Sequence, residues 1–315
     1  MKVLLIGNFG SGNIGDELIL ASSLRDYPNA VVMTADPEFS RHFCGRTLET
    51  VPFPPTGVRS AWKYLFSSRY RKAFALQGIQ QVVFPGGGLF AIKPKACWIW
   101  FQIFRWVKRV YTGSIHLLHQ GVDEHLGWWS RLITKFVLSR ASTVTVRDES
   151  SRRAVQALCG KNVENDHDKL QTIKLQTTNK KEKMVLINAR AKFDAKMLKR
   201  FEGQEMIFVA FDRSDLKYVP QDFEGEVVYP KTEKEVFDLF TKAQYVVGER
   251  FHVLLLGSHF CGTDKTFVLR EPYAEKVKSF CEKEKIQSLS CGIYGTLRYS
   301  FALLVRRGGL RLWYS

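Results

Sequence analysis

Short hydrophobic runs alternate with longer amphipathic stretches along the chain, and this alternation predicts strands followed by helices. In the first half, the runs predict strands at residues 3–6, 30–34, 80–84, 114–119 and 142–146. The pattern restarts with predicted strands at residues 184–188, 205–211, 226–229, 244–247 and 266–269. Strands that alternate with helices are typical of parallel sheets covered by helices.

A polar passage at residues 169–183, rich in Lys, Gln and Thr, lies between the two series and predicts a linker. We therefore expect an α/β protein with two Rossmann-like parallel-sheet lobes, residues 1–178 and 179–315, that face each other across a cleft. Residues 294–307 predict a C-terminal helix in the second lobe.

The composition is that of a globular protein, and the net charge predicts a partner of negative charge. The chain has 315 residues, 45% of them hydrophobic and 25% charged, which is typical of globular domains. Its net charge is +16, and residues 50–122 contain Lys and Arg but no Asp or Glu. A phosphorylated substrate or an anionic membrane surface would suit this charge. Nucleic acid is the weaker interpretation, because no recognition module of a known kind is present.

The cysteines and the first residues bear on the compartment. The six cysteines are widely spaced and form no CxxC pair, which argues against a disulfide framework or a zinc site. The first hydrophobic run is too short for a signal peptide. These features favour a cytoplasmic protein with reduced thiols, and we expect no metal and no cofactor.

Residues 96–110 form a strongly aromatic stretch with basic residues at its far end. The stretch is too short to span a bilayer. It is either a helix packed in the first lobe or an interfacial helix that lies on anionic lipid. Both interpretations stay open from the sequence.

Three motifs of the first lobe follow predicted strands. Gly10, Gly12 and Gly15 have the spacing of a dinucleotide-binding fingerprint, but Asp16 follows at once and places negative charge where a pyrophosphate would lie. This motif is a ligand-facing turn that presents Asn13, Gly15 and Asp16. A second turn carries the consecutive glycines Gly86, Gly87 and Gly88, which allow close approach of a ligand or a neighbouring loop.

The third motif places Arg147 between a strand and a helix. Its guanidinium either faces a ligand or pairs with Asp148 or Glu149. The sequence leaves these two interpretations equally open.

Two motifs of the second lobe carry cationic groups at strand ends. Arg190 follows the first strand, and its guanidinium suits carboxylate or phosphate. Arg250 and His252 lie two residues apart in a turn between a strand and an apolar helix, whose N-terminus favours negative charge. Histidine can also donate or accept a proton near neutral pH.

Taken in order, these motifs resemble the polysaccharide pyruvyl transferase family over nearly the whole chain. The resemblance implies a fold similar to GT-B glycosyltransferases and an enzyme that moves the pyruvyl group of phosphoenolpyruvate onto a sugar as a ketal. It implies donor binding by Arg190, Arg250 and His252, with Lys276 as a further contact. We add Arg147 as a candidate for donor binding and take His252 as the candidate proton donor. Asn13 and Asp16 would lie on the facing lobe, towards donor or acceptor, and the glycine turns would line the acceptor side or the cleft, with Asp16 as the candidate base.

The implied partners are phosphoenolpyruvate and a free or lipid-linked saccharide of a cell-surface polysaccharide precursor, with peripheral contact to an anionic membrane. One departure from the family is the absence of an acidic residue in the run from Leu89 to Lys95, which leaves the base open. Two other readings also stay open: a nucleotide-sugar glycosyltransferase of similar fold, and a family member that binds sugar or lipid without catalysis.

Overall fold

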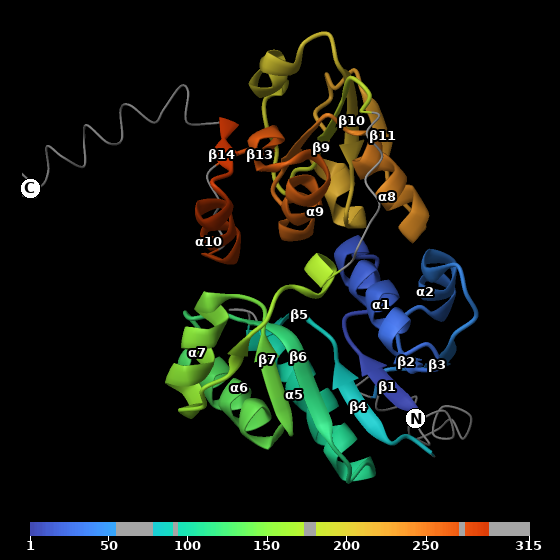
Figure 1. Ribbon diagram of the computed structural model, residues 1–315, viewed down its shortest axis with the longest axis vertical. Helices are drawn as coiled ribbons and strands as arrows, with labels where there is room; N and C mark the ends of the chain where they lie inside the picture. Colours follow the sequence, from blue (N-terminus) through green and yellow to red (C-terminus); the bar gives the residue numbers. More distant parts are fainter. Residues whose placement is uncertain (55–77, 91–93, 173–180, 271–274, 290–315) are drawn as a thin grey trace, which may run out of the picture. The chain divides into compact units, whose positions relative to one another are not determined.

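The computed structural model describes residues 1–54, 78–90, 94–172, 181–270 and 275–289. The predicted C-terminal helix at residues 294–307 lies outside these residues, as does Cys291. The chain divides into two compact units (Figure 1). The N-terminal lobe comprises Met1–Thr177 with the short segments Phe211–Arg213 and Tyr229–Asp238, and the C-terminal lobe comprises Thr178–Ala210, Ser214–Val228 and Leu239–Ser315.

The N-terminal sheet is parallel in every pair of its strands. Its strand order is β3-β2-β1-β4-β6-β7-β8, with β5 also paired to β6. The strands are β1 (Val3–Ile6), β2 (Val31–Met33), β3 (Glu49–Val51), β4 (Gln81–Phe84), β5 (Gly87–Phe90), β6 (Ile115–Val122), β7 (Thr143–Val146) and β8 (Glu164–Asn165). All five strands expected from the hydrophobic runs are present, whereas β3, β5 and β8 were not expected.

The sequence placed all three glycines in a turn at the end of a strand, but two of them lie in a further strand. Gly87 and Gly88 begin β5, and Gly87 pairs with Gln120 of β6. Gly86 alone remains between the two strands, with a φ of 143°. The sequence did not reveal the strand because glycine is depleted in strands and gives no hydrophobic signal.

The C-terminal sheet is also parallel, with the order β11-β10-β9-β12-β13-β14. Its strands are β9 (Met184–Ile187), β10 (Glu205–Val209), β11 (Glu226–Val228), β12 (Tyr245–Gly248), β13 (Thr266–Val268) and β14 (Gln287–Ser288). Counted along the chain, this is the 3-2-1-4-5-6 order of the Rossmann fold. Both lobes are therefore parallel-sheet α/β units, as the sequence predicted.

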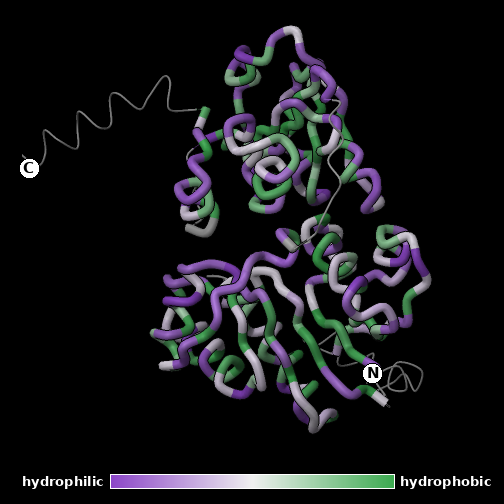
Figure 2. The backbone as a smooth tube through the Cα atoms, viewed as in Figure 1, coloured by the Kyte–Doolittle hydropathy of each residue, from purple (hydrophilic) through white to green (hydrophobic). Residues whose placement is uncertain are grey.

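Helices connect the parallel strands, as such sheets require. The α-helices are α1 (Ile14–Asp26), α2 (Pro37–Cys44), α5 (Pro94–Val110), α6 (Trp128–Arg140), α7 (Glu149–Cys159), α8 (Glu233–Lys242), α9 (Phe251–Cys261) and α10 (Glu275–Glu284). The 3₁₀ helices are η1 (Lys169–Thr172), η2 (Ala195–Phe201), η3 (Arg213–Tyr218) and η4 (Thr263–Lys265). Figure 2 shows long hydrophobic stretches along the strands, with more polar residues on the connecting segments.

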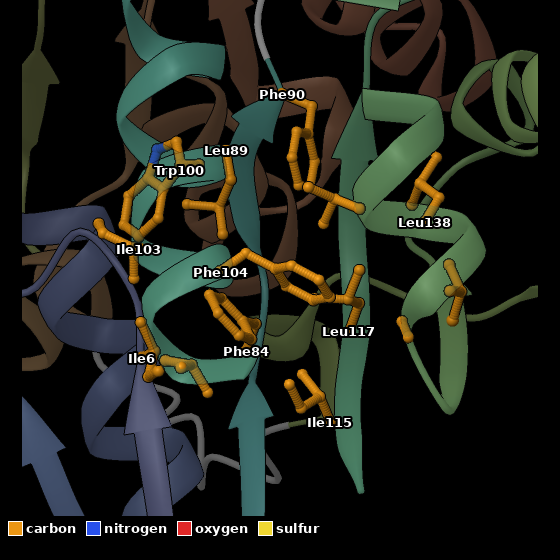
Figure 3. Packing of buried hydrophobic residues seen from close by; sticks show 14 of the residues in the cluster. Ile6, Phe84, Leu89, Phe90, Trp100, Ile103, Phe104, Ile115, Leu117 and Leu138 are labelled. Carbon is orange, nitrogen blue, oxygen red and sulfur yellow. The ribbon is translucent and has the colours of Figure 1, made fainter. Parts of the chain in front are cut away.

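The core of the N-terminal lobe lies between α5 and the sheet. Trp100, Ile103 and Phe104 of α5 are buried against Phe84 of β4 and Leu117 of β6 (Figure 3). These α5 residues recur at helical spacing, so one side of the helix faces the sheet. The structure thus agrees with the packed interpretation of residues 96–110 for most of the aromatic side chains, although Trp98 is exposed.

Two further expectations concern the linker and the cysteines. Residues 169–172 of the predicted linker form η1, and Leu170 is buried in the first lobe. Residues 173–180 lie outside the described part of the chain.

Five of the six cysteines, all except Cys291, lie in the described part of the chain, and these five are free thiols, as expected.

We predict that Phe104→Ala lowers the free energy of unfolding of the N-terminal lobe by about 3–5 kcal/mol, because the ring is fully buried and leaves a cavity. Urea unfolding followed by circular dichroism measures this change. Leu132→Ala on α6 is the control, since this side chain is 55% exposed. Equal losses for both variants would contradict the assignment of Phe104 to the core.

Candidate functional site

The centre of the C-terminal sheet is its switch point, the place where the chain reverses the direction in which it adds strands. From β9 the chain moves through β10 to β11, and from β12 it moves through β13 to β14 on the other side. Ligands of open α/β sheets bind beyond the carboxyl ends of the strands at such a point. Arg190 follows β9, and Arg250 and His252 follow β12, so all three belong to this edge.

Arg250 is held by a carboxylate that the sequence did not reveal. Its Nε and Nη2 donate to the two carboxylate oxygens of Asp215, each at 2.6 Å. Asp215 lies on η3 and is fully buried. Asn188, directly after β9, donates from Nδ2 to Asp215 at 3.2 Å and accepts the Arg250 amide on Oδ1 at 3.2 Å. The side chain of Arg250 is therefore oriented by a fork-to-fork pair.

A second buried carboxylate, Glu249, orders the neighbouring loops. Its Oε2 accepts the backbone amide of Arg190 at 2.5 Å, and its Oε1 accepts Nε of Arg270, which follows β13. Arg270 also donates from Nη2 to the carbonyl of Ala191 at 3.0 Å. Glu249 thereby connects the loops after β9, β12 and β13, while the side chain of Arg190 is exposed.

His252 lies in the first turn of α9 and is partly exposed. The helix begins at Arg250 without a side-chain cap, and the first amides of a helix have no acceptor within it. This end therefore favours an anion. Lys276 lies in α10, but its side chain is outside the described part of the structure.

Asn188 and Glu249 lie at the ends of predicted buried strands, close to Arg190 and Arg250 in the chain. A polar residue at the end of a buried strand is therefore the signal that could have revealed them. Arg270 has the same signal, because it follows the predicted strand at residues 266–269, whereas Asp215 gave none. Asp215 is 35 residues from its partner Arg250, and Arg270 is 21 residues from Glu249. Only the order of the strands brings them together.

The N-terminal sheet has its own switch point between β1 and β4. The loop after β1 presents Asn13, whose Oδ1 accepts the amide of Gly15 at 3.0 Å and caps α1. Asp16 accepts Nδ2 of Asn8 at 2.8 Å and is 9% exposed. One Asp16 oxygen lies 3.6 Å from the place where a side chain on Gly87 would begin. The first two motifs of this lobe are thus adjacent, with Gly86 between β4 and β5 and Gly88 exposed on β5.

Glu17 is a buried carboxyl beneath this loop. Its Oε1 accepts the amide of Gly10 at 2.6 Å. Gly10 has a φ of 72°, and a Cβ there would lie 2.2 Å from the backbone nitrogen of Asp36, so this tight turn requires glycine. Burial raises the pKa of Glu17 from 4.5 to about 7, and the charge of Asp16 adds to the rise while the Gly10 amide opposes it.

Arg147 is buried in the N-terminal lobe, and its charge is balanced by two carboxylates. Nε is 3.3 Å from Asp148, and Nη1 is 3.4 Å from the buried Asp168. Burial alone would raise the pKa of Asp148, but the Arg147 guanidinium and hydrogen bonds from Ser151 and Ser150 hold it below its ordinary value. A Cβ on Gly121 would lie 2.5 Å from Nη2, so a side chain there would displace the guanidinium. Of the two interpretations from the sequence, the structure has the pair with Asp148.

A cavity of about 240 Å³ lies near the carboxyl end of β6. It is lined by Asp123, Glu124, Leu126, Arg131, Arg153, Ala154, Ala157 and Leu158. Glu124 is paired with Arg153 at 2.9 Å. None of the residues predicted for the site lines this cavity.

Two Rossmann-type lobes with polar loops at both switch points define a protein of the GT-B type, and comparison with solved structures agrees. UDP-GlcNAc 2-epimerase from Methanocaldococcus jannaschii matches with a TM-score of 0.58 at 10% identity, covering 91% of this chain and 88% of that one. The Neisseria meningitidis enzyme matches with a TM-score of 0.55 at 10% identity, covering 98% and 92%. HepE of Anabaena matches with a TM-score of 0.51 at 15% identity, covering 94% and 91%.

The family follows from the sequence match. Residues 13–261 match the model of the polysaccharide pyruvyl transferase family, and the chain belongs to this family. The match begins at Asn13, the last residue of the loop after β1, and ends with α9, so it includes the glycines after β4 and the loops after β9 and β12. Curated protein sequences give no match.

We predict that Glu17→Gln removes a pH dependence of stability. The folded state binds the Glu17 proton more tightly than the unfolded chain, so this stabilisation is present below pH 4.5 and is lost as the pH rises through about 7. The loss amounts to about 3 kcal/mol in the parent protein and is absent in the variant. Urea unfolding at a series of pH values between about 5 and 8 measures it.

Glu38→Gln on α2 is the matched control, because Glu38 is exposed. It should leave the slope of stability against pH unchanged. Identical slopes for the parent and Glu17→Gln would show that Glu17 does not titrate in this range.

Proposed function

We propose that the chain transfers the pyruvyl group of phosphoenolpyruvate to a saccharide of a cell-surface polysaccharide precursor and forms a cyclic ketal. The proposal is supported by family membership and by one structural observation. The two switch-point strands of the C-terminal lobe end in cationic residues whose loops are tied together by the buried carboxylates of Asp215 and Glu249.

This edge suits a small molecule that carries a carboxylate and a phosphate. Arg190 offers an exposed guanidinium, Arg250 an oriented one, and the start of α9 adds the positive end of a helix. We assign donor binding to Arg190, Arg250 and His252, with Lys276 as a further contact. We assign Arg147 to ordering the turn between β7 and α7, because two carboxylates already balance its charge.

Ketal formation from phosphoenolpyruvate requires proton transfer and stabilisation of negative charge. Protonation of C3 of the enol makes C2 an oxocarbenium-like electrophile, which one sugar hydroxyl attacks. Phosphate then leaves and takes up the proton of a second hydroxyl, which closes the ketal ring. In this scheme His252 donates the proton, and the arginines stabilise the departing phosphate. Asp16, in the N-terminal lobe, is the candidate that accepts the proton of the attacking hydroxyl.

We predict that the chain releases phosphate from phosphoenolpyruvate when a suitable lipid-linked or free hexosamine acceptor is present. His252→Ala should lower this turnover by about 10²–10⁴-fold, because it removes the proton donor. His259→Ala is the matched control, since His259 is exposed at the other end of α9.

Near-normal phosphate release by His252→Ala would end the assignment of His252. A thermal shift produced by UDP or GDP, with none produced by phosphoenolpyruvate, would contradict the proposed reaction and favour a nucleotide-sugar glycosyltransferase.

We also predict that Asp215→Asn raises KM for phosphoenolpyruvate by about 10- to 100-fold, because Arg250 loses the carboxylate that orients it. The amide preserves an acceptor for Asn188, so the fold should be retained. Steady-state kinetics with the donor varied measures the effect. Asp222→Asn, in the loop before β11, is the control because its side chain is exposed. An unchanged KM would show that the pair with Asp215 does not position Arg250 for the donor.

A further inference from the structure

Two neighbouring helices of the N-terminal lobe expose aromatic side chains that the core does not use. α5 and α6 pack against each other, and both bury one side in the same core. On α6, Trp128 is 72% exposed, Leu132 55% and Trp129 45%, while Trp98 on α5 is 37% exposed. Exposed tryptophans in such number call for an explanation, because large apolar side chains that gather on a surface mark contact sites.

Ring contacts join these residues across the two helices. Trp98 lies 5.5 Å from Phe101 on α5, and Phe101 lies 5.2 Å from Phe136 on α6. Trp129, Leu132 and Phe136 follow one another at helical spacing, so they share one side of α6. We call the surface of Trp98, Phe101, Trp128, Trp129, Leu132 and Phe136 the α5–α6 face.

The charged side chains of α5 and α6 all have one sign, although the acidic Asp123 and Glu124 precede α6 and line a cavity with Arg131. Neither helix contains an Asp or a Glu. Together the helices carry Lys95, Arg105, Lys108, Arg109, Arg131, Lys135 and Arg140. Two of these guanidiniums lie over rings of the face: Arg140 is 3.6 Å from the centre of Phe136, and Arg105 is 5.5 Å from that of Phe101.

We infer that the α5–α6 face docks on the surface of an anionic lipid bilayer. Tryptophan is favoured at the level of the lipid headgroups, where its ring is buried and its N–H stays hydrated. Lys and Arg around it are attracted by anionic headgroups. No helix in the described part of the chain is long and apolar enough to cross a membrane, so the protein would lie on the bilayer by this face.

The α5–α6 face lies at the edge of the N-terminal sheet that carries Asp16, so docking would place this edge at the membrane. Trp128 and Trp129 are in the first turn of α6, and Trp98 is near the start of α5. Both helices follow strands of a parallel sheet, so they begin at the carboxyl edge, where Asp16 and Gly87 also meet. Docking would bring this edge near the headgroups, where a lipid-linked acceptor presents its saccharide. The docking itself does not depend on the proposed reaction.

Co-sedimentation with vesicles tests the inference on the full chain without donor or acceptor. The parent protein should bind vesicles with about 30 mol % phosphatidylglycerol and should bind pure phosphatidylcholine vesicles far less. The double variant Trp128→Ala/Trp129→Ala should bind the anionic vesicles about tenfold or more weakly, because it removes two side chains that would be buried. About 0.5 M salt should also weaken the binding of the parent protein.

Val227→Ala on β11 is the control, because it removes an exposed apolar side chain (45%) outside the face. The second test variant, Arg131→Glu/Lys135→Glu, should lose binding to anionic vesicles while keeping its circular dichroism spectrum. Equal binding of the parent and the tryptophan variant would overturn the inference. A dimer that dissociates on Trp128→Ala/Trp129→Ala, with no vesicle binding by the parent, would also overturn it. Phosphate release with a water-soluble acceptor stays measurable in every variant, so failure of docking and failure of the proposed function are distinguishable.

Discussion

The buried carboxylate of Asp215 must be paired, and its pairing with Arg250 determines how the C-terminal lobe presents positive charge. A carboxylate without exposure to water is costly unless hydrogen bonds and an opposite charge compensate it. Arg250 and Asn188 supply both, from the ends of the two strands that flank the switch point. The buried carboxylate of Glu249 likewise accepts hydrogen bonds from Nε of Arg270 and from the Arg190 amide. The cationic loops are therefore ordered by buried acids, and the side chain of Arg190 is exposed beside them.

The N-terminal lobe uses the same sheet topology with the opposite chemistry. The loop after β1 presents the carboxylate of Asp16 near the glycines after β4, and Glu17 holds the Gly10 turn from beneath. Negative charge at the start of α1 disfavours a phosphate there. The arrangement suits hydroxyl groups, which carboxylates accept as hydrogen-bond donors. One fold thus provides one edge whose loops are cationic and one edge whose loops are acidic, because loop residues rather than sheet topology decide the chemistry.

The aromatic residues of α5 illustrate how one segment serves two surfaces. The stretch was open to two interpretations from its composition, namely a packed helix or a helix on lipid. The buried Trp100, Ile103 and Phe104 belong to the core, whereas Trp98 belongs to the exposed α5–α6 face. The more exposed members of that face come from α6. The sequence did not predict an exposed face on α6, because this helix has a shorter hydrophobic run than α5.

The sequence by itself determined the alternation of strands and helices, the two parallel-sheet lobes, the family, and the position of Arg250 and His252 between a buried strand and an apolar helix. These features depend on local spacing, since hydrophobic periodicity specifies which side of an element is buried. The tertiary structure alone decided which charges meet. Asp215 pairs with Arg250 across 35 residues, and the short strands β3, β5, β8 and β14 are defined by their pairing with a neighbouring strand. Such pairings depend on the order of strands in the sheet, and a linear pattern of residues does not encode that order directly.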